Sequence, residues 1–366
     1  MGLKCGIVGL PNVGKSTFFN AITETASAEA ANYPFCTIEP NSAMVKVEDY
    51  RLYQLADIAK SLRIVPAFIE FVDIAGLVSG ASKGEGLGNK FLSHVREVDA
   101  ILHVVRCFDD DDVMHVNGKV NPISDIATVE NELILSDMSV LEKHIDNYGR
   151  KARCGDKFFI ELRTFALNLM KLLESGSGVR SHPDLLKKEK ELREMHLITS
   201  KPVIYVCNVA EKDIATGNSY SQTVFDLASS RGSFAFYLSA KIESEIAILT
   251  SNQEKKEFLA SLGVVESGIS KVVKRAYNIL GLESYFTVGE NETRMWTIKK
   301  GAKAPQAAGI IHSDFEDGFI RAEVSSYEDY VASGGRSKSR SEGKDYVVQD
   351  GDVINFLFNK TQSKSV

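Results

Sequence analysis

The chain has 366 residues, of which 44% are hydrophobic and 25% charged, and its formal net charge is −6. This composition is close to the globular average and excludes collagen-like, low-complexity and wholly disordered chains. The acidic balance argues against a surface that is basic throughout and binds free nucleic acid through its phosphates. At about 150 residues per domain, the length predicts two or three domains.

No run of about 18 apolar residues and no signal-peptide pattern are found in the sequence. The five cysteines are widely spaced and form no CxxC pair: Cys5, Cys36, Cys107, Cys154 and Cys207. This spacing supports neither a disulfide framework nor a zinc knuckle. We therefore expect a cytoplasmic protein with reduced thiols and no membrane contact.

Short apolar, β-branched runs alternate with longer segments in the first third of the chain and again after residue 201. We expect strands at Lys4–Val8, Ala67–Asp73, Ala100–Phe108, Pro202–Val209 and Ser233–Ala240. Near-continuous apolar strands joined by crossovers long enough for helices predict a mostly parallel sheet with helices on both faces. The sequence therefore predicts an α/β nucleotide-binding fold.

Between the third and fourth of these strands, apolar residues recur in steps of four and three. The first series is Ile134, Met138, Leu141, Ile145, Tyr148 and Ala152, and the second is Phe158, Leu162, Phe165, Leu169 and Leu172. Two such helices joined by a tight turn at Gly155 form an antiparallel coiled-coil arm, and the alternative is that they cover the sheet. A third helix is expected at Asp184–Ile198. Residues 129–201 are thus interpreted as a helical insertion into a domain formed by residues 1–128 and 202–282.

The pattern changes again from about Glu283, where short alternating apolar runs are separated by Gly and Asp. The sequence QDGD between two such runs predicts a β-hairpin. We expect residues 283–366 to form a small sheet-rich domain with its own core. The loop GGRSKSRSEGK at residues 334–344 is densely basic, and it is either a solvated loop or a nucleic-acid contact.

The segment GLPNVGKS, at residues 9–16, fits the pattern GxxxxGK[ST] and stands between an apolar strand and the helical sequence STFFNAIT. In this motif the backbone N–H groups of the loop and of the helix N-terminus face the phosphates. Lys15 is expected to contact the β and γ phosphates, and Ser16 to bind Mg²⁺. The motif predicts a nucleoside triphosphate site.

A second group of segments follows the order of the GTPase superfamily. The DxxG sequence in FVDIAG predicts Asp73 near Mg²⁺ and the Gly76 N–H near the γ phosphate, and Thr37 is a candidate for a further hydroxyl ligand of the metal. The residue after this motif is Leu77, whereas Ras-type proteins have a glutamine there that orients the attacking water. Another group must therefore organise hydrolysis.

The base-reading segment has the sequence NVAE, at residues 208–211, where NKxD is usual, and Ser239 begins the sequence SAK after the next strand. Guanine is normally bound by an aspartate that accepts from its ring nitrogens. Glu211 is one methylene longer than aspartate, and Val209 replaces the lysine. The sequence therefore argues against guanine specificity.

His115 follows the acidic run at residues 109–112, in the loop after the strand Ala100–Phe108. The carboxyl end of that strand should lie near the nucleotide in a doubly wound sheet. An imidazole with a pKa of about 6.5 is able to orient or deprotonate water. We predict that His115 replaces the missing glutamine; the alternative is a loop histidine that caps a backbone group.

Several of these segments together resemble the Obg-related YchF family, also called Obg-like ATPases. They are GLPNVGKSTFFNAIT, NYPFCTIEPN, DIAGLVSGASKGEGLGNKFL, HVNGKVNP, NVAEKD, APQAAGIIHSDFEDGFIRAE and EGKDYVVQDGDVINFLF. The resemblance implies a P-loop ATPase of the GTPase superfamily that prefers ATP to GTP, with a G domain, a coiled-coil insertion and a C-terminal TGS domain of β-grasp type. It also implies slow hydrolysis and association with the ribosome, expected at the large subunit, with nucleotide state switching this association.

The resemblance also assigns residues. Phosphates are expected at Asn12, Val13, Gly14, Lys15, Ser16 and Thr17; the base at Phe108, Asn208 and Val209; and the family's mobile catalytic histidine at His115. Glu211 and Ser239 complete the predicted nucleotide-binding set, Ser16, Thr37 and Asp73 the Mg²⁺ set, and Lys15, Gly76 and His115 the catalytic set.

Asn12 is also a candidate ligand for K⁺, as in relatives that lack the glutamine, and the alternative is a residue that shapes the loop. We expect a monomer that contacts RNA through its TGS domain or helical arm. Two other functions stay open at this point: a nucleotide-gated binding module with incidental hydrolysis, and a GTP-dependent nucleic-acid-binding protein.

Overall fold

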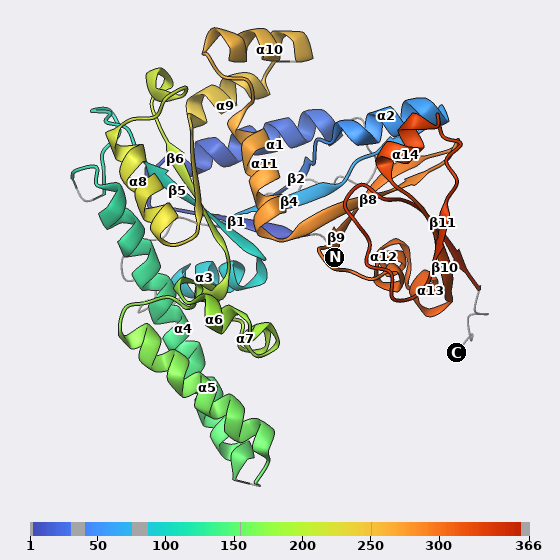
Figure 1. Ribbon diagram of the computed structural model, residues 1–366. Coiled ribbons are helices and arrows are strands. Elements are labelled where there is room, and N and C mark those ends of the chain that lie inside the picture. Colours follow the sequence, from blue (N-terminus) through green and yellow to red (C-terminus); the bar gives the residue numbers. More distant parts are fainter. Residues whose placement is uncertain are drawn as a thin grey trace. The chain divides into compact units, whose positions relative to one another are not determined.

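The computed structural model describes residues 3–30, 41–74, 87–116, 118–153, 155–249 and 251–359. The chain divides into two compact units (Figure 1). The first comprises Met1–Ala28, Thr37–Met44 and Glu70–Lys271, and the second comprises Glu29–Cys36, Val45–Ile69 and Val272–Val366. Among the described residues, no helix has the length and apolar character that a membrane span requires.

A six-stranded sheet forms the core of the first unit, in the order β2-β4-β1-β5-β6-β7. The strands are β2 (Ser42–Lys46), β4 (Phe68–Asp73), β1 (Lys4–Val8), β5 (Ala100–Arg106), β6 (Val203–Asn208) and β7 (Phe234–Leu238). From β4 to β7 all neighbouring strands are parallel. Ile7 is in register with Asp73 and Leu102, and Arg106 with Asn208, so the carboxyl ends of four strands meet at one edge. This confirms the predicted parallel sheet.

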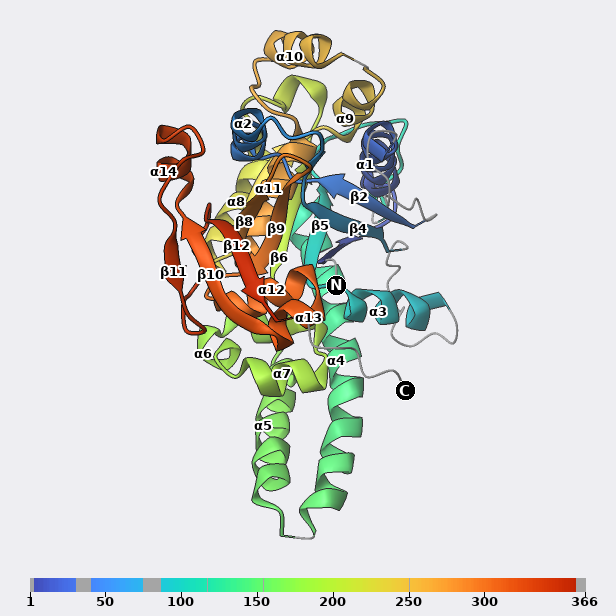
Figure 2. The ribbon, with the colours of Figure 1, turned by 90° about the vertical axis from the view of Figure 1, so that its right-hand side faces the viewer.

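Helices lie on both faces of this sheet (Figures 1 and 2). They include α1 (Lys15–Ala30), α3 (Leu87–Glu97), α8 (Ser219–Ser230) and α9 (Ala240–Ala247), with a short 3₁₀ turn η3 (Glu211–Asp213) after β6. Leu259 of α10 (Asn252–Ser261) shares a small core with Ile242 and Ile246 of α9, and α11 (Gly268–Ile279) follows along the chain. The Glu243 carboxylate accepts hydrogen bonds from the Gly268 and Ile269 N–H groups, at 2.7 and 3.2 Å, and so caps α11. A buried carboxylate at a helix N-terminus satisfies donors that lack intrahelical partners.

Two long helices, α4 (Pro122–Ala152) and α5 (Lys157–Glu174), lie side by side and antiparallel (Figure 2). From Ile134 onward, α4 packs on α5 and the two share a core of their own. The predicted register is correct except at the ends of α5, where Phe159 and Leu173 pack inward while Phe158 is 48% exposed. Residues three and four positions apart lie on the same face of a helix. At the ends of α5 the apolar pattern therefore does not show which of two adjacent residues packs inward.

The third helix predicted at Asp184–Ile198 is wrong, because that segment forms only short pieces. They are η1 (Val179–Ser181), α6 (Pro183–Leu186), α7 (Glu189–Met195) and η2 (Ile198–Ser200). The buried Asp137 carboxylate of α4 accepts from the Ile198 and Thr199 N–H groups, at 2.9 and 2.7 Å. His196 has a φ of 49°, which ends α7 just before these bonds.

A second six-stranded sheet, in the order β11-β10-β12-β8-β9-β3, forms the second unit. The strands are β11 (Arg340–Glu342), β10 (Phe319–Ser325), β12 (Val353–Phe358), β8 (Leu282–Val288), β9 (Thr293–Lys299) and β3 (Ile64–Val65), and the helices include α12 (Ala304–Ile311), α13 (Ser313–Asp317) and α14 (Tyr327–Ala332). The β8–β9 hairpin is followed by α12, and β12 returns parallel to β8. This is the topology expected of a β-grasp fold.

The hairpin predicted at QDGD is wrong. β12 pairs antiparallel with β10 and parallel with β8, while Val347 makes only an isolated bridge with Lys303. The Asp352 carboxylate accepts from the Gln349 N–H, at 2.9 Å, and from the Tyr346 hydroxyl, at 2.7 Å. These side-chain bonds give the loop an alternative to a hairpin ladder.

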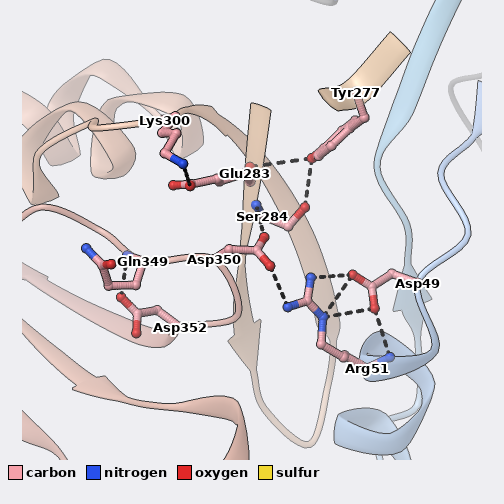
Figure 3. A network of polar contacts seen from close by, with 9 residues as sticks. All are labelled: Asp49, Arg51, Tyr277, Glu283, Ser284, Lys300, Gln349, Asp350 and Asp352. Atoms are coloured by element: carbon pink, nitrogen blue, oxygen red, sulfur yellow. Dashed lines mark hydrogen bonds and ion pairs between the residues drawn. The ribbon is translucent and has the colours of Figure 1, made fainter. Parts of the chain in front are cut away.

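Residues 45–69 belong to the second unit, although the sequence analysis placed all of residues 1–128 in the nucleotide-binding domain. β3 adds to the second sheet beside β9, and α2 (Tyr50–Ala59) carries Arg51. The Arg51 guanidinium donates to Asp49 and, at 2.7 Å, to Asp350, whose other oxygen accepts from the Ser284 N–H at 2.8 Å (Figure 3). Because Arg51 and Asp350 lie 299 residues apart in the sequence, no local sequence pattern indicates that they pair.

Candidate functional site

A cavity of about 880 Å³ lies at the carboxyl edge of the parallel sheet in the first unit. It is lined by Leu10, Pro11, Asn12, Gly14, Lys15, Ser16, Thr17, Asp73, Phe108, Asp109, Asp110, Val113, Asn208, Val209, Ala210, Glu211, Ser239, Ala240 and Lys241. Five segments supply these residues, and they lie at the carboxyl ends of β1, β4, β5, β6 and β7 or just after them. The structure therefore brings together phosphate-binding and base-reading segments that lie about 200 residues apart in sequence.

The loop between β1 and α1 has a backbone that only particular residues allow. Gly14 has a φ of 90°, and a Cβ there would lie 2.2 Å from the Asn208 Nδ2 atom. A Cβ at Gly9 would lie 2.7 Å from the Val104 carbonyl oxygen. The first turn of α1 has N–H groups without intrahelical acceptors, and they open on the cavity beside Ser16 and Thr17. The result is a site suited to anions.

Lys15 and Asp73 form an ion pair inside this cavity, in which the Lys15 ammonium donates to the Asp73 carboxylate. Lys15 is buried, and it belongs to the first turn of α1, whereas Asp73 ends β4. The Ser16 hydroxyl lines the same cavity from an exposed position. A cation for phosphates thus lies beside two oxygen donors for a metal.

The donor set of Ser16 and Asp73 fits Mg²⁺, which prefers oxygen ligands and completes its shell with water and substrate phosphates. Among the described residues, no group of three or more His, Cys, Asp or Glu side chains could hold a metal ion alone. The phosphates would therefore have to supply part of the coordination. Thr37 and Gly76, the other residues predicted here, lie outside the described residues.

Asn208 holds two loops of the site together. Its Nδ2 donates to the Val13 carbonyl at 2.9 Å, and its Oδ1 accepts from the Ala240 N–H at 2.9 Å. The side chain is buried at the carboxyl end of β6. Val13 does not line the cavity, and its carbonyl accepts the hydrogen bond from Asn208. Asn208 and Val13 were predicted to contact the ligand, and no sequence pattern indicates the hydrogen bond between them.

Phe108, Val209, Glu211 and Ser239, which were predicted to bind the nucleotide, line the remaining wall of the cavity. Three charged residues that were not singled out lie there too: Asp109, Asp110 and Lys241. The acidic run and the SAK sequence were visible in the chain, but the sequence did not indicate which of their side chains reach the cavity.

Beneath this wall lie two buried free thiols, Cys107 and Cys207. A hydrogen bond with Cys207 and burial both raise the pKa of the Cys107 thiol well above its ordinary value. A neutral buried thiol is a poor nucleophile. These cysteines therefore belong to the packing of the site and not to its chemistry.

His115 does not line the cavity. Its ring is buried, and Nε2 lies 2.9 Å from the Asp125 Oδ2 atom in the first turn of α4. The loop that carries it still meets the phosphate loop, because the Asn12 side-chain amide donates to the Met114 carbonyl at 3.1 Å. The loop thus lies at the site while the imidazole faces α4.

Comparisons with known proteins agree with this geometry. The family model described as "50S ribosome-binding GTPase" matches residues 4–144, and YchF-GTPase_C, described as "Protein of unknown function (DUF933)", matches residues 282–359. The "Ribosome-binding ATPase YchF" of Bacillus subtilis is 53% identical and that of Escherichia coli O157:H7 is 50% identical, each over 98% of this chain and 100% of the relative. "Obg-like ATPase 1" of Gallus gallus is 42% identical over 98% of this chain and 93% of the relative.

A solved structure of the same kind covers both units. The Schizosaccharomyces pombe YchF GTPase superposes with a TM-score of 0.84 and 39% identity, over 97% of this chain and 98% of that one. The likeness includes the nucleotide-binding sheet as well as the C-terminal region matched by its own family model. From its phosphate loop to its C-terminal sheet, the chain belongs to the YchF family of Obg-like ATPases.

Proposed function

We propose that this protein binds ATP with Mg²⁺, hydrolyses it slowly, and binds the ribosome in a manner that depends on the bound nucleotide. The observation that carries the proposal is the single cavity in which Lys15, Ser16 and Asp73 lie together with the NVAE segment. The relatives named ribosome-binding ATPases support the same activity.

The phosphates would lie on the N-terminus of α1. Lys15 would leave Asp73 and contact the β and γ phosphates, and Ser16, Asp73 and Thr37 would hold Mg²⁺, which neutralises charge developing on the transferred phosphoryl group. Gly76 would donate its N–H to the γ phosphate. When the Lys15–Asp73 pair separates, Lys15 would pair with the phosphates and Asp73 with Mg²⁺. Nucleotide binding would therefore leave neither charge without an opposite charge beside it.

The base would lie between Phe108 and the NVAE segment. A guanine-reading carboxylate needs a fixed distance to the ring nitrogens, and Glu211 begins a 3₁₀ turn with a longer side chain than aspartate. Val209 has a buried side chain and donates its N–H to the Leu238 carbonyl at 2.8 Å, so neither its side chain nor its N–H provides a polar contact to guanine. We therefore propose that ATP is preferred to GTP.

Hydrolysis would require His115 to leave Asp125 and to orient the attacking water, since Leu77 has no polar group for that role. The hydrogen bond between the His115 imidazole and the buried Asp125 carboxylate keeps the imidazole away from the cavity. This supports a slow basal rate of ATP hydrolysis. Asn12, with a φ of 62°, is proposed as a K⁺ ligand beside the phosphates. A cation there would assist the transfer in place of an arginine finger.

The ribosomal contact is proposed for the large subunit, in keeping with the family description "50S ribosome-binding GTPase". RNA contact by the α4–α5 pair or by the C-terminal unit, a cytoplasmic location and a monomeric state belong to the same proposal. Sedimentation velocity of the isolated protein tests the monomer.

Co-sedimentation with ribosomal subunits tests the function directly. With ATP, ADP and GTP compared, the protein should pellet with the large subunit in a nucleotide-dependent manner, and Lys15→Ala should lose that dependence. ATP turnover should rise when ribosomes are added. Binding that ignores the nucleotide, or pelleting that is strongest with GTP, would contradict the proposal.

A further inference from the structure

We propose that Arg106 is a positioning residue that fixes the nucleoside-facing wall of the cavity, by holding the loop at residues 108–113 in one shape. The inference rests on the proposed nucleotide site. It concerns a residue at the end of β5 that does not itself line the cavity.

The Arg106 side chain is buried, with 2% of its surface exposed, yet it carries a full charge. Each of its three guanidinium nitrogens donates a hydrogen bond to a different backbone carbonyl of the following loop. Nε donates to Phe108 at 3.1 Å, Nη1 to Val113 at 2.8 Å and Nη2 to Asp110 at 3.2 Å. The planar group thus joins the start, the middle and the end of one loop.

The same guanidinium lies against the Phe108 ring, with 4.7 Å between its central carbon and the ring centroid. Phe108 also lines the cavity, so the residue that Arg106 contacts belongs to the wall that a base would meet. A guanidinium on an aromatic face is held by cation–π attraction and by planar stacking. Arg106 therefore sets the orientation of the ring that a nucleobase would meet.

Other contacts hold the edges of this loop, and two short-range bonds lie inside it, from the Asp112 N–H to the Asp110 carboxylate at 3.0 Å and from the Val113 N–H to the Asp110 carbonyl at 3.3 Å. The Cys107 N–H donates to the Asn208 carbonyl, and the Cys107 carbonyl accepts from the Asn218 side chain, both at 2.8 Å. The Tyr220 hydroxyl reaches the exposed Asp109 carboxylate at 3.2 Å. Among the described residues, no carboxylate forms an ion pair with Arg106, so the guanidinium's role is directed at the loop backbone.

A lysine in this position cannot reproduce the arrangement, because one ammonium cannot face three carbonyls in a plane and stack on a ring. Arg106→Lys should therefore keep the charge but release Phe108 and the loop. None of the three Arg106 bonds involves the phosphate loop, whose Asn12 side chain contacts this segment at the Met114 carbonyl, beyond the residues that Arg106 holds. The variant should lose the contribution of the nucleoside to binding and keep that of the phosphates.

Calorimetric titration with MgATP and with magnesium tripolyphosphate separates the two contributions. We expect Arg106→Lys to weaken ATP binding by about tenfold, and tripolyphosphate binding by less than about twofold. Arg180→Lys is the control: Arg180 is partly buried, donates to two carbonyls, Thr199 and Ile198, and does not line the cavity. It should leave both titrations within about twofold of the parent.

Phe108→Leu gives a second route to the same result, because it removes the ring and keeps the guanidinium bonds; it should produce the same selective loss of ATP affinity. Unchanged ATP binding in Arg106→Lys, or an equal loss for both ligands, would overturn the proposal, and so would an unfolded Arg106→Lys together with a Phe108→Leu that binds ATP normally. A parent protein that binds tripolyphosphate as tightly as ATP would instead refute the proposed nucleoside site.

Discussion

Replacing Arg51 by alanine tests how the second unit is held together. Arg51 joins two segments that lie 299 residues apart in sequence, because its guanidinium binds Asp49 beside it and Asp350 in the loop before β12 (Figure 3). It also lies over the Phe286 ring, 5.4 Å from the centroid. The variant leaves both carboxylates without their cation.

The size of the effect follows from the exposure of each partner. Asp49 has an 11% exposed side chain, and losing its charged hydrogen bonds should cost about 1.5–2 kcal/mol. Asp350 is 45% exposed, so solvent screening reduces its share to about 0.5–1 kcal/mol. Contact with Phe286 adds about 0.5 kcal/mol. Together we expect the free energy of unfolding to fall by about 3 kcal/mol.

The fluorescence of Trp296 provides the assay, because it is the only tryptophan in the chain and lies on β9 against the core of this unit. With a urea dependence of about 2 kcal/mol per molar, the transition midpoint should fall by about 1.5 M. Arg321→Ala is the control: its pair with Glu323 is exposed, and it should shift unfolding by less than about 0.5 kcal/mol. Equal midpoints for Arg51→Ala and Arg321→Ala would refute this reasoning.

Other predictions concern the nucleotide site and pH. Lys15→Ala should remove most triphosphate affinity and Ser16→Ala should mainly weaken Mg²⁺-dependent binding and turnover, as measured by calorimetry and phosphate release; a parent rate of hydrolysis in either variant would exclude this loop as the active site. His115→Ala should abolish most turnover while ATP affinity stays within about threefold, or about 0.7 kcal/mol, since His115 does not line the cavity; an unchanged rate would assign its role to another group. Burial lowers the pKa of His103 to about 4 from its ordinary 6.5, so the unfolded chain takes up a proton on acidification before the folded one does. The stability that this provides is complete above about pH 6.5 and is lost as the pH falls toward 4, with a loss on the order of 2–3 kcal/mol at pH 4.5. Urea unfolding should therefore show a smaller loss between pH 7 and 4.5 for His103→Gln than for the parent, and equal losses would contradict it.

The sequence predicted the nucleotide-binding sheet well because its signals are local. β1 was predicted at its observed bounds, and β4, β5, β6 and β7 were predicted to within two residues at each end. The phosphate loop was identified because its glycines and its lysine occupy fixed positions in a short motif. Each of these segments is recognisable from its own residues, so periodicity and spacing were sufficient; the sixth strand, β2, was not predicted.

Other features could not be predicted because they depend on pairing between distant residues. The Asp137 carboxylate, which is 61 residues from Ile198, breaks the predicted helix at 184–198. Residues 45–69 join the second unit through β9 and Asp350, which no local pattern indicates. Arg106 stands in an apolar strand, where sequence alone does not show that its guanidinium turns back on the next loop.

The central claim is that the cavity of the first unit binds ATP in preference to GTP. The direct measurement is calorimetric titration of the purified protein with MgATP and MgGTP under the same conditions. We predict tighter binding of ATP, with the binding of both nucleotides lost in Lys15→Ala. Binding of GTP that is tighter by about tenfold, a difference of about 1.4 kcal/mol in the wrong direction, would contradict the account.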